Sequence, residues 1–272
     1  MGLGLSVLNP ANCDNHYNRM VKPYLVPSIK RAFQILDLLS EHEAGLTLSD
    51  LHRELKFPLS STATILYTLQ ALGCVEREPE TSRYRLGIRV LAFSRRALDQ
   101  IGMVARCHPL IEQLVKDCGL TAHLAILRDG NSIYIDRVCA PGLIQFSSYI
   151  GMRWPAHASA VGKALLTFMN DADREAAFEQ LTLKKITDNT VTSKDVLLQQ
   201  LRTFRKLGYA WEIGEGDPAV GCVAAPVFCA EKVLAAVSVT GTTQQITKNR
   251  VTSLGPLIRQ YCHQMSERLA SA

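Results

Sequence analysis

His157, Glu212 and Cys222 are the residues of this 272-residue chain whose types could support covalent chemistry. A base, an orienting carboxylate and a thiol nucleophile act together when their side chains lie within hydrogen-bonding distance. Residues of these types are scattered through most chains, and no short spacing links the three here. The sequence therefore predicts no catalytic residues, and an enzyme that uses Cys222 stays open only as an alternative.

A second set of polar residues has the spacing of a surface that contacts nucleic acid. Hydroxyl side chains crowd residues 59–72, although short hydroxyls are poor helix formers. The set comprises Ser60, Ser61, Thr62, Thr64, Tyr67 and Thr68. On a helix in the major groove of DNA, such side chains reach phosphates and base edges. The alternative is that some hydroxyls only cap the helix, above all those of Ser60 and Ser61.

Three arginines follow in the next segment: Arg77, Arg83 and Arg85. Each presents a rigid fork of donors that suits phosphate oxygens or the minor groove. Residues 24–89 contain as many acidic as basic side chains, so DNA binding must rest on where these arginines lie. A solvated hairpin with ion pairs to Glu76 or Glu78 is the alternative.

Short helices and a hairpin are predicted to position these side chains. Thr47 and Asp50 have the spacing of a capping box at a helix start. Pro58 ends that helix, and a second one runs to Gly73, which closes it in the left-handed conformation. A further helix that begins at Ser28, with Ser28 as its cap, packs behind them. Together with the hairpin, these helices predict a winged helix-turn-helix over residues 24–87.

The rest of the chain alternates strand and helix patterns. We expect a connector helix over residues 88–107, from Ile88 to about Arg106, and a helix from Pro109 to Cys118. Further helices are expected over 159–169, 171–181, 194–207 and 249–270, and strands over 124–127, 133–138, 145–150, 220–228 and 233–240. The sequence thus predicts an α+β fold in which residues 108–272 form a sensor (GAF-like) domain with an antiparallel sheet flanked by helices. Residues 1–23 are expected to be a flexible extension, with Met1 and Met20 both candidate start residues.

Composition excludes several classes of protein. Hydrophobic residues make up 47% and charged residues 20%, and no apolar run approaches the roughly 18 residues that span a bilayer. The N-terminus lacks a signal-peptide pattern, so we expect a cytoplasmic protein with no membrane partner. Its eight cysteines include no Cys-x-x-Cys pair, which predicts neither a metal site nor a cofactor. A net charge of +5 permits a nucleic-acid partner without requiring one.

Several sequence blocks resemble those of the IclR-type transcriptional regulators, and the resemblance covers about residues 25–270. In the first domain these are Pro58-x-Ser60-Ser61 and Arg83-Tyr84-x-Leu86-Gly87. In the second they are residues 155–166, Gly208-Tyr209-Ala210, residues 222–227 and residues 237–241, in the family's order.

This resemblance implies a DNA-binding first domain, a small-molecule pocket in the second domain, and homodimers or dimers of dimers. The family's ligand positions fall at Ala160, Val161, Glu212, Cys222, Ser238 and Thr240. Three departures stand out: Thr64 occupies a position where Arg is usual, and Ala160 and Ala219 replace frequent glycines.

The residues around these positions suggest the chemistry of the ligand. The N-terminus of a helix that starts near Ser159 attracts an anion such as a carboxylate. Ser238 and Thr240 alternate on one strand, so their hydroxyls point to the same side. Phe146 and Trp154 could wall the pocket, which favours a flat or aromatic organic acid. The alternative is that all of these residues belong to the core, with their polar groups hydrogen-bonded inside the protein.

The sequence therefore predicts a ligand-responsive DNA-binding transcriptional regulator. A symmetric dimer implies a double-stranded operator with inverted half-sites about one helical turn apart, or a multiple of it. A ligand-binding protein whose winged helix contacts another protein is the alternative, because the first domain has no net charge. The effector, the operator sequence, the regulated genes and the choice between activation and repression stay open.

Overall fold

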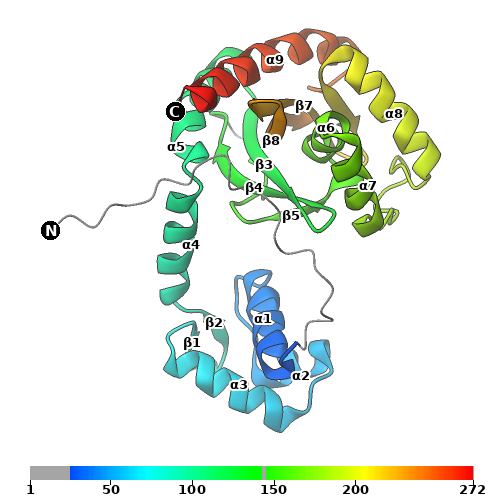
Figure 1. The fold of residues 1–272 in the computed structure, drawn as a ribbon. Coiled ribbons are helices and arrows are strands. Elements are labelled where there is room, and N and C mark those ends of the chain that lie inside the picture. Colours follow the sequence, from blue (N-terminus) through cyan, green and yellow to red (C-terminus); the bar gives the residue numbers. More distant parts are fainter. Residues whose placement is uncertain (1–24, 143–144, 272) are drawn as a thin grey trace, which may run out of the picture. The chain divides into compact units, whose positions relative to one another are not determined.

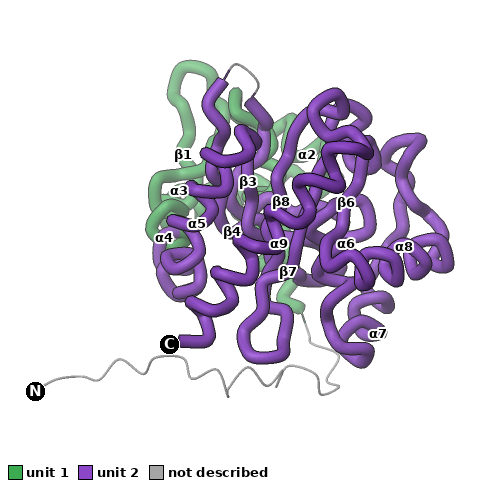
Figure 2. Tube along the Cα trace, turned by 90° about the horizontal axis from the view of Figure 1, so that it is seen from above, with its two compact units in different colours: residues 1–94 green, residues 95–272 purple. Residues whose placement is uncertain are grey.

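The computed structural model describes residues 25–142 and 145–271. The chain divides into two compact units, Met1–Ser94 and Arg95–Ala272, which Figure 2 shows in different colours. The boundary falls within one helix, α4 (Arg89–Gln100). Each unit has its own hydrophobic core, as expected for a chain of this length.

The first unit is the predicted winged helix-turn-helix (Figure 1). Its elements are α1 (Pro27–Ser40), α2 (Leu48–Leu55), α3 (Leu59–Ala71), β1 (Val75–Arg77) and β2 (Tyr84–Leu86). The two strands pair antiparallel, with Val75 opposite Leu86. Ile35 of α1, Leu51 of α2 and Leu66 of α3 are fully buried and meet in one core, which fixes the helices against each other.

Local sequence signals account for most of these boundaries. The Thr47 hydroxyl accepts from the Asp50 amide at 3.2 Å and the Asp50 carboxylate accepts from the Thr47 amide at 3.1 Å, which confirms the capping box. Gly73 has φ +71° after α3, as predicted. The prediction for Ser28 was wrong, because Val26 occupies the cap position without a side-chain bond and Pro27 opens α1.

The expected single helix from Ile88 to about Arg106 is also wrong, since the helix is interrupted. α4 ends at Gln100, and α5 (Met103–Cys118) begins after Ile101 and Gly102. Glycine is a poor helix former, so a break there costs little. Pro109, expected to open a helix, lies inside α5, where burial of the apolar side of α5 offsets one missing amide donor.

The second unit is built on a six-stranded antiparallel sheet with the order β5-β4-β3-β8-β7-β6. The strands are β3 (Thr121–Arg128), β4 (Asn131–Val138), β5 (Arg153–Pro155), β6 (Ala210–Ile213), β7 (Val220–Cys229) and β8 (Lys232–Thr242). The helices are α5, the short 3-10 turn η2 (Ala156–Ala158), α6 (Ala160–Phe168), α7 (Asp171–Gln180), α8 (Lys194–Leu207) and α9 (Lys248–Ala270).

Helices cover both faces of this sheet (Figure 1). α5 and α9 pack on the face that carries Leu124, Val223 and Val237. α6 packs on the other face, where alanines such as Ala125 and Ala224 let the helix approach closely, and α8 and α7 lie against α6. The two faces therefore differ in side-chain size, and the α6 face carries polar groups beyond its alanines.

Two strand predictions need correction. Residues 145–150, expected to be a strand, form a loop between Gly142 (φ +138°) and Gly151 (φ +93°). The carbonyls of Phe146 and Ser148 accept hydrogen bonds from the Arg137 side chain instead of a neighbouring strand. The strands β5 and β6 were not predicted, because three or four residues are too short for an alternating pattern to show.

The longest described helix, α9, is 23 residues long and closes the second unit. Its buried side carries Val251, Ile258 and Met265, whereas Arg259 and Arg268 are exposed. Among the helices of residues 25–142 and 145–271, none is both long and apolar enough to cross a membrane.

Candidate nucleic-acid interface and effector site

The exposed side of α3 carries four of the six hydroxyl residues expected to face DNA: Ser60, Thr64, Tyr67 and Thr68. Their spacing of three and four residues places them on one side of the helix. Tyr67 is 76% exposed, a large fraction for an aromatic side chain. The Thr64 and Thr68 hydroxyls donate to the carbonyls four residues earlier, at 3.0 and 2.9 Å, so their oxygens remain available as acceptors.

Thr62 and Ser61 do not belong to this exposed set. Thr62 is fully buried and its hydroxyl donates to the Pro58 carbonyl at 3.1 Å, so the prediction of a DNA contact for Thr62 is wrong. The Ser61 hydroxyl is half-buried and accepts from Arg31 of α1 at 3.1 Å. Pro58 occupies the cap position of α3 without a side-chain bond, so the capping alternative for the serines is wrong too.

The three wing arginines have different surroundings. Arg77 is exposed, donates to Ser82 at 2.8 Å and lies over the ring of Tyr84. Arg85 is exposed and lies 3.7 Å from Glu78, a weak pair of the kind that the solvated alternative expected. Arg83 is half-buried and donates to the Gly45 carbonyl at 2.7 Å, so it ties the wing to the loop between α1 and α2.

The residues expected to bind the effector converge on the α6 face of the sheet. The strand register places Glu212 opposite Cys222, and Cys222 opposite Thr240. Ser238 lies two residues before Thr240 and shares its face. The Cys222 sulfur and the Thr240 hydroxyl are 3.3 Å apart, whereas Glu212 and Ser238 are buried.

Three further residues on this face were missed by sequence reasoning: His123, Tyr134 and Arg137. His123 lies opposite both Ser238 and Arg137 on its two neighbouring strands. Its ring stacks on Tyr134 at 4.4 Å, its Nδ1 lies 3.3 Å from the Thr240 hydroxyl and its Nε2 lies 2.8 Å from Ser148 Oγ. Alternation alone would place Tyr134 and Arg137, three residues apart on β4, on opposite faces, and only the shifted register beside Leu124 and Ala125 brings them to the same one.

The two aromatic residues expected to wall the pocket lie in different places. Phe146 is half-buried and lines a hollow of about 130 Å³ whose walls include Thr121 and Thr240. Trp154 belongs to β5 and packs on the loop after β6. Its indole nitrogen lies so close to Gly216 of that loop that a Cβ added to this glycine would be only 2.6 Å away. Phe146 therefore reaches one end of the polar face, and Trp154 supports a neighbouring loop.

The start of α6 is tightly packed. Ala160 and Val161 are buried in the core. The Ser159 hydroxyl accepts from the Gly162 amide at 3.2 Å and caps the helix. One turn later, the fully buried Lys163 ammonium donates to the Glu215 carboxylate and, at 2.9 Å, to Gln200.

Burial controls the protonation of this region. Burial, reinforced by the nearby Glu215 charge, raises the pKa of Glu212 to about 7, although the Glu215 amide donates to its carboxylate at 2.9 Å. Burial, with the Arg137 charge, lowers the pKa of His123 to about 3, so its ring is neutral at pH 7. Burial and the Glu212 charge raise the pKa of the Cys222 thiol well above its usual value.

The arrangement proposed for an enzyme is not formed. A buried thiol with a raised pKa is a poor nucleophile. His157 is fully buried and its Nε2 lies 3.0 Å from the Lys184 carbonyl, while its Nδ1 has no partner among the described atoms. The Cys222 thiol lies instead 3.3 Å from the Thr240 hydroxyl, and the His157 ring is bonded elsewhere.

Comparison with protein families matches both units. The model for the C-terminal region of bacterial IclR transcriptional regulators matches residues 95–267, and the IclR helix-turn-helix model matches residues 28–79. The chain belongs to the IclR family. As a member of this family it is a DNA-binding transcriptional regulator with a C-terminal ligand-binding domain, and not an enzyme.

Relatives within the IclR family align over most of their length. The regulator XynR of Escherichia coli is 31% identical over 223 residues, which cover 82% of this chain and 88% of XynR. The transcriptional repressor IclR of the same organism is 29% identical over 236 residues, 86% of each chain. The similarity therefore spans both the DNA-binding and the ligand-binding region.

Solved structures of the IclR family share the fold. A regulator from Alicyclobacillus acidocaldarius superposes with a TM-score of 0.77 at 28% identity, covering 90% of this chain and 100% of the other. An IclR homologue from Microbacterium hydrocarbonoxydans, solved as a complex with 4-hydroxybenzoate, has a TM-score of 0.75 at 20% identity and the same coverage. At that identity the second comparison supports the fold alone.

Proposed function

We propose that this protein binds an inverted-repeat operator and changes its occupancy or its activity when a small organic acid binds the α6 face of its sheet. The observation that carries the proposal is the presence in one IclR-family chain of an exposed hydroxyl-rich helix and of a buried polar sheet face. The site of action is the cytoplasm, where double-stranded operator DNA is accessible.

The DNA contacts follow from the exposed side of α3. Placed in the major groove, α3 presents Thr64 and Tyr67 to base edges, with Ser60 and Thr68 near phosphates. Arg77 and Arg85 of the wing contact the sugar-phosphate backbone, because both are exposed. Ser61 and Arg83 support the domain from within, since each already holds another element.

The effector contacts follow from the polar face under α6. Glu212, Cys222, Ser238 and Thr240 supply hydrogen-bonding groups, and Ala160 and Val161 supply apolar surface at the start of α6. Phe146 lines the hollow that ends at Thr240. The Microbacterium homologue was solved as a complex with 4-hydroxybenzoate, so an aromatic acid is one candidate class to test on this chain.

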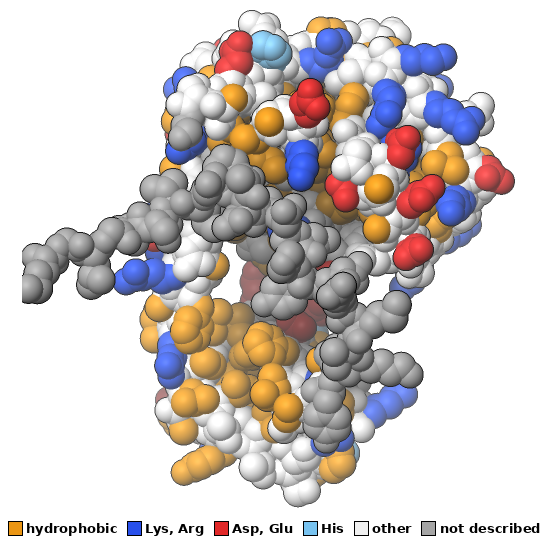
Figure 3. Space-filling model, viewed as in Figure 1, with side chains coloured by type: hydrophobic (Ala, Val, Ile, Leu, Met, Phe, Trp, Pro, Cys, Tyr) orange, Lys and Arg blue, Asp and Glu red, His pale blue; other side chains and the backbone are white. Residues whose placement is uncertain are grey.

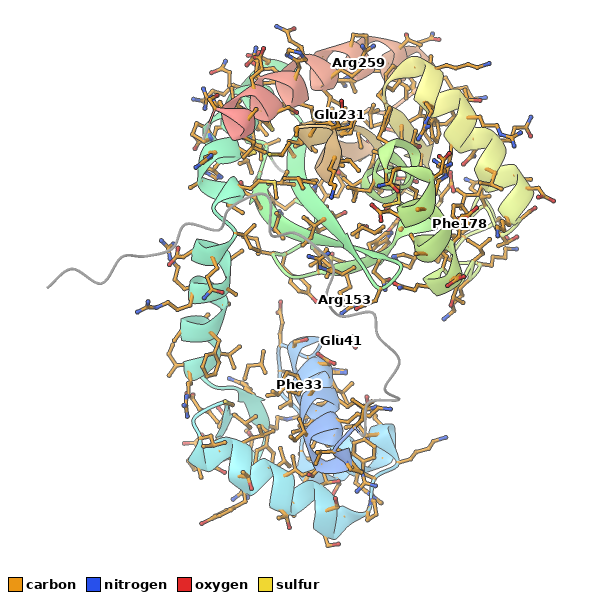
Figure 4. All side chains as sticks on the ribbon, viewed as in Figure 1. Phe33, Glu41, Arg153, Phe178, Glu231 and Arg259 are labelled. Carbon is orange, nitrogen blue, oxygen red and sulfur yellow. The ribbon has the colours of Figure 1, made fainter. Side chains whose placement is uncertain are left out.

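Exposed apolar side chains in the first unit support assembly into homodimers, or into dimers of dimers. They comprise Leu25, Ile29, Phe33, Ile88, Leu91 and Phe93. Figure 3 shows hydrophobic side chains gathered on the first unit, and Phe33 of α1 is labelled in Figure 4. A second copy is the fitting occupant, because an inverted repeat requires two symmetry-related reading helices.

Signalling in this proposal is an equilibrium between two arrangements. Residues 24–87 read DNA, residues 108–272 bind the effector, and residues 88–107, which include α4, join them. The effector shifts the equilibrium between these arrangements, and with it the spacing of the paired winged helices. The size of the shift is limited by the difference in the effector's affinity for the two arrangements.

A gel-shift titration at several salt concentrations tests the DNA part. We expect the full chain to retain fragments from its own upstream region in a sequence-specific way, with affinity that falls as salt rises. A second candidate function, in which the winged helix binds protein, is favoured by the equal numbers of acidic and basic residues in 24–89. Absence of specific retention at low salt would favour that second function.

A further inference from the structure

Arg137 of β4 is half-buried, and its guanidinium donates to uncharged carbonyl oxygens, whereas its backbone amide donates to the Asp136 carboxylate at 2.8 Å. Its two terminal nitrogens donate to the carbonyls of Phe146, at 2.8 Å, and of Ser148. Its Nε is buried and has no hydrogen-bond partner among the described atoms. A buried donor without a partner costs free energy, so such groups in native proteins commonly await a ligand or a water.

The strand register places Arg137 beside the effector residues. Arg137 lies opposite His123, and His123 lies opposite Ser238, so the three side chains share the α6 face on adjacent strands. The His123 ring reaches the Thr240 hydroxyl at 3.3 Å, and the Phe146 that Arg137 holds lines the same hollow as Thr240. The guanidinium is therefore at the β4 end of the polar face.

The opposite end of this face is acidic. Glu212 of β6 and Glu215 lie together, because the Glu215 amide donates to the Glu212 carboxylate, and the Lys163 ammonium donates to the Glu215 carboxylate. The two ends are joined across the face by a chain of neighbours, because Glu212 lies opposite Cys222, Cys222 contacts the Thr240 hydroxyl, and Thr240 contacts His123 opposite Arg137. The polar face is thus cationic at β4 and acidic at β6.

This polarity disfavours the start of α6 as the place for a carboxylate. The first turn of α6 is already capped by the Ser159 hydroxyl. A carboxylate bound there would also lie near the Glu215 and Glu212 carboxyl groups, since both act on Lys163 one turn along the helix. Like charges at short range in a buried site repel each other strongly.

We propose that Arg137 and His123 form the anion subsite of the effector pocket, and that Glu212 accepts a hydrogen bond from a hydroxyl group at the other end of the ligand. The effector class is then a hydroxy acid that carries its carboxylate and its hydroxyl at opposite ends. This inference rests on the proposed function, because it assigns the orientation of the acid within that site. His123 contributes a neutral ring that also bonds Thr240 and Ser148.

Calorimetric titration of the full chain with matched acid and amide probes tests the anion subsite. The probes are 4-hydroxybenzoate with 4-hydroxybenzamide, and 4-hydroxybutanoate with 4-hydroxybutanamide, which differ within each pair chiefly in charge. We expect the wild type to prefer one acid over its amide by about tenfold or more, as for a charge-assisted hydrogen bond. Arg137→Gln is expected to remove that preference and to leave amide binding within about twofold.

The control is Arg153→Gln, because Arg153 of β5 is exposed and pairs with the exposed Asp129 at 3.2 Å (Figure 4). This variant is expected to keep the preference for the acid. If Arg137→Gln does not fold, Arg137→Lys replaces it, and the preference is expected to fall because an ammonium lacks the planar fork. An unchanged preference in the folded Arg137 variant would overturn the anion subsite while leaving the proposed function standing.

The Glu212 end is tested with benzoate in the same experiment. We expect wild type to bind 4-hydroxybenzoate more tightly than benzoate, and Glu212→Ala to remove that difference. Equal binding of the two acids by wild type would overturn the assignment of Glu212 to a hydroxyl. If no acid binds the wild type at all, the proposed acid effector fails, and the anion subsite fails with it.

Discussion

Glu212 and Glu215 are two carboxyl groups buried beside one ammonium, that of Lys163. At the scale of single residues, this imbalance determines how the second unit responds to pH. The other titratable groups that act on or near Glu212 are Cys222 and Tyr134, both of which are held neutral by burial. Burial is the main reason that the pKa of Glu212 is raised, and the nearby Glu215 charge adds to it, while the Lys163 charge opposes it.

The first prediction concerns Glu212→Gln. Because the pKa of Glu212 is about 7 in the folded protein and about 4.5 in the unfolded chain, the folded state binds more protons between these values. Its contribution to the free energy of unfolding is therefore largest below pH 4.5 and is lost as pH rises through 7. We expect Glu212→Gln to flatten this dependence and to stabilise the protein at pH 8 by roughly 2 kcal/mol.

Chemical denaturation followed by the fluorescence of Trp154 and Trp211, both in the second unit, measures this change. The matched control is Glu231→Gln, at an exposed glutamate of the β7–β8 turn (Figure 4), which is expected to leave the curve unchanged. Equal pH dependence in Glu212→Gln and wild type would show that Glu212 ionises as in the unfolded chain.

The second prediction concerns Thr64, which is exposed on α3. We expect Thr64→Arg to change which base is preferred at one base pair of the operator, with a free-energy difference between right and wrong base of about 1–3 kcal/mol. Effector binding is expected to stay intact. Selection of binding sites from a random DNA pool measures the change. Ser40→Arg adds the same charge at the exposed end of α1 and is expected to alter affinity without altering preference. An identical selected sequence for Thr64→Arg and wild type would remove Thr64 from the reading surface.

Residue types and spacing predicted which segment of the chain reads DNA and which strands carry the polar groups, but not the orientation of each side chain. Thr62 and Ser61 fit the hydroxyl pattern as well as Thr64 does, yet the turn of α3 buries Thr62 and directs Ser61 to Arg31. His123 and Arg137 carried no local signal, because their proximity to Ser238 depends on pairing between strands distant in sequence.

At the scale of elements, the approach of α6 to the sheet positions the effector residues. Gly162 of α6 packs on η2, the turn before the helix, because a Cβ at Gly162 would overlap the Cα and carbonyl oxygen of Ala156. The sheet surface under α6 carries only short side chains where it meets the helix, because alanines of β3, β7 and β8 lie there. This close packing keeps the start of α6 beside the polar ends of β6, β7 and β8.

The third prediction is that Gly162→Ala destabilises the second unit by roughly 2 kcal/mol or more, since backbone atoms cannot move aside as a flexible side chain does. It is also expected to weaken effector binding. Gly102→Ala is the matched control, because nothing lies within 4 Å of a Cβ at Gly102 and its φ is −29°. Tryptophan fluorescence during denaturation measures both variants, and equal stability of the two would contradict the close packing of α6.

Element boundaries were predictable where a local signal fixed them, as at Thr47, Gly73 and the helix Lys194–Leu207. They were not predictable where tertiary contacts decide. Pro109 stays inside α5 because residues before and after it, Cys107 and Leu110, are buried in the core and stabilise the helix. Residues 145–150 have strand-forming side chains, but the Arg137 guanidinium holds their carbonyls in a loop.

At the scale of the whole molecule, the proposed reading of an inverted repeat requires two copies. Ile88, Leu91 and Phe93 are 71%, 61% and 56% exposed, and apolar side chains gathered in this way are typical of an interface. The fourth prediction is that the double variant Ile88→Glu and Leu91→Glu shifts the protein from dimer to monomer in sedimentation velocity. Operator affinity is expected to fall by about a hundredfold through loss of the second reading helix. Val196→Glu, at an exposed apolar residue of α8, is the control.

The central claim, an operator read by a symmetric pair of winged helices under the control of an organic acid, is tested most directly by footprinting. The full chain is bound to its own upstream region with and without 4-hydroxybenzoate or 4-hydroxybutanoate. We expect protection of two inverted half-sites about one helical turn apart, or a multiple of it, and a change in protection or in its spacing when the effective acid is added. Protection of a single asymmetric half-site, or a symmetric footprint that no acid alters, would contradict the account.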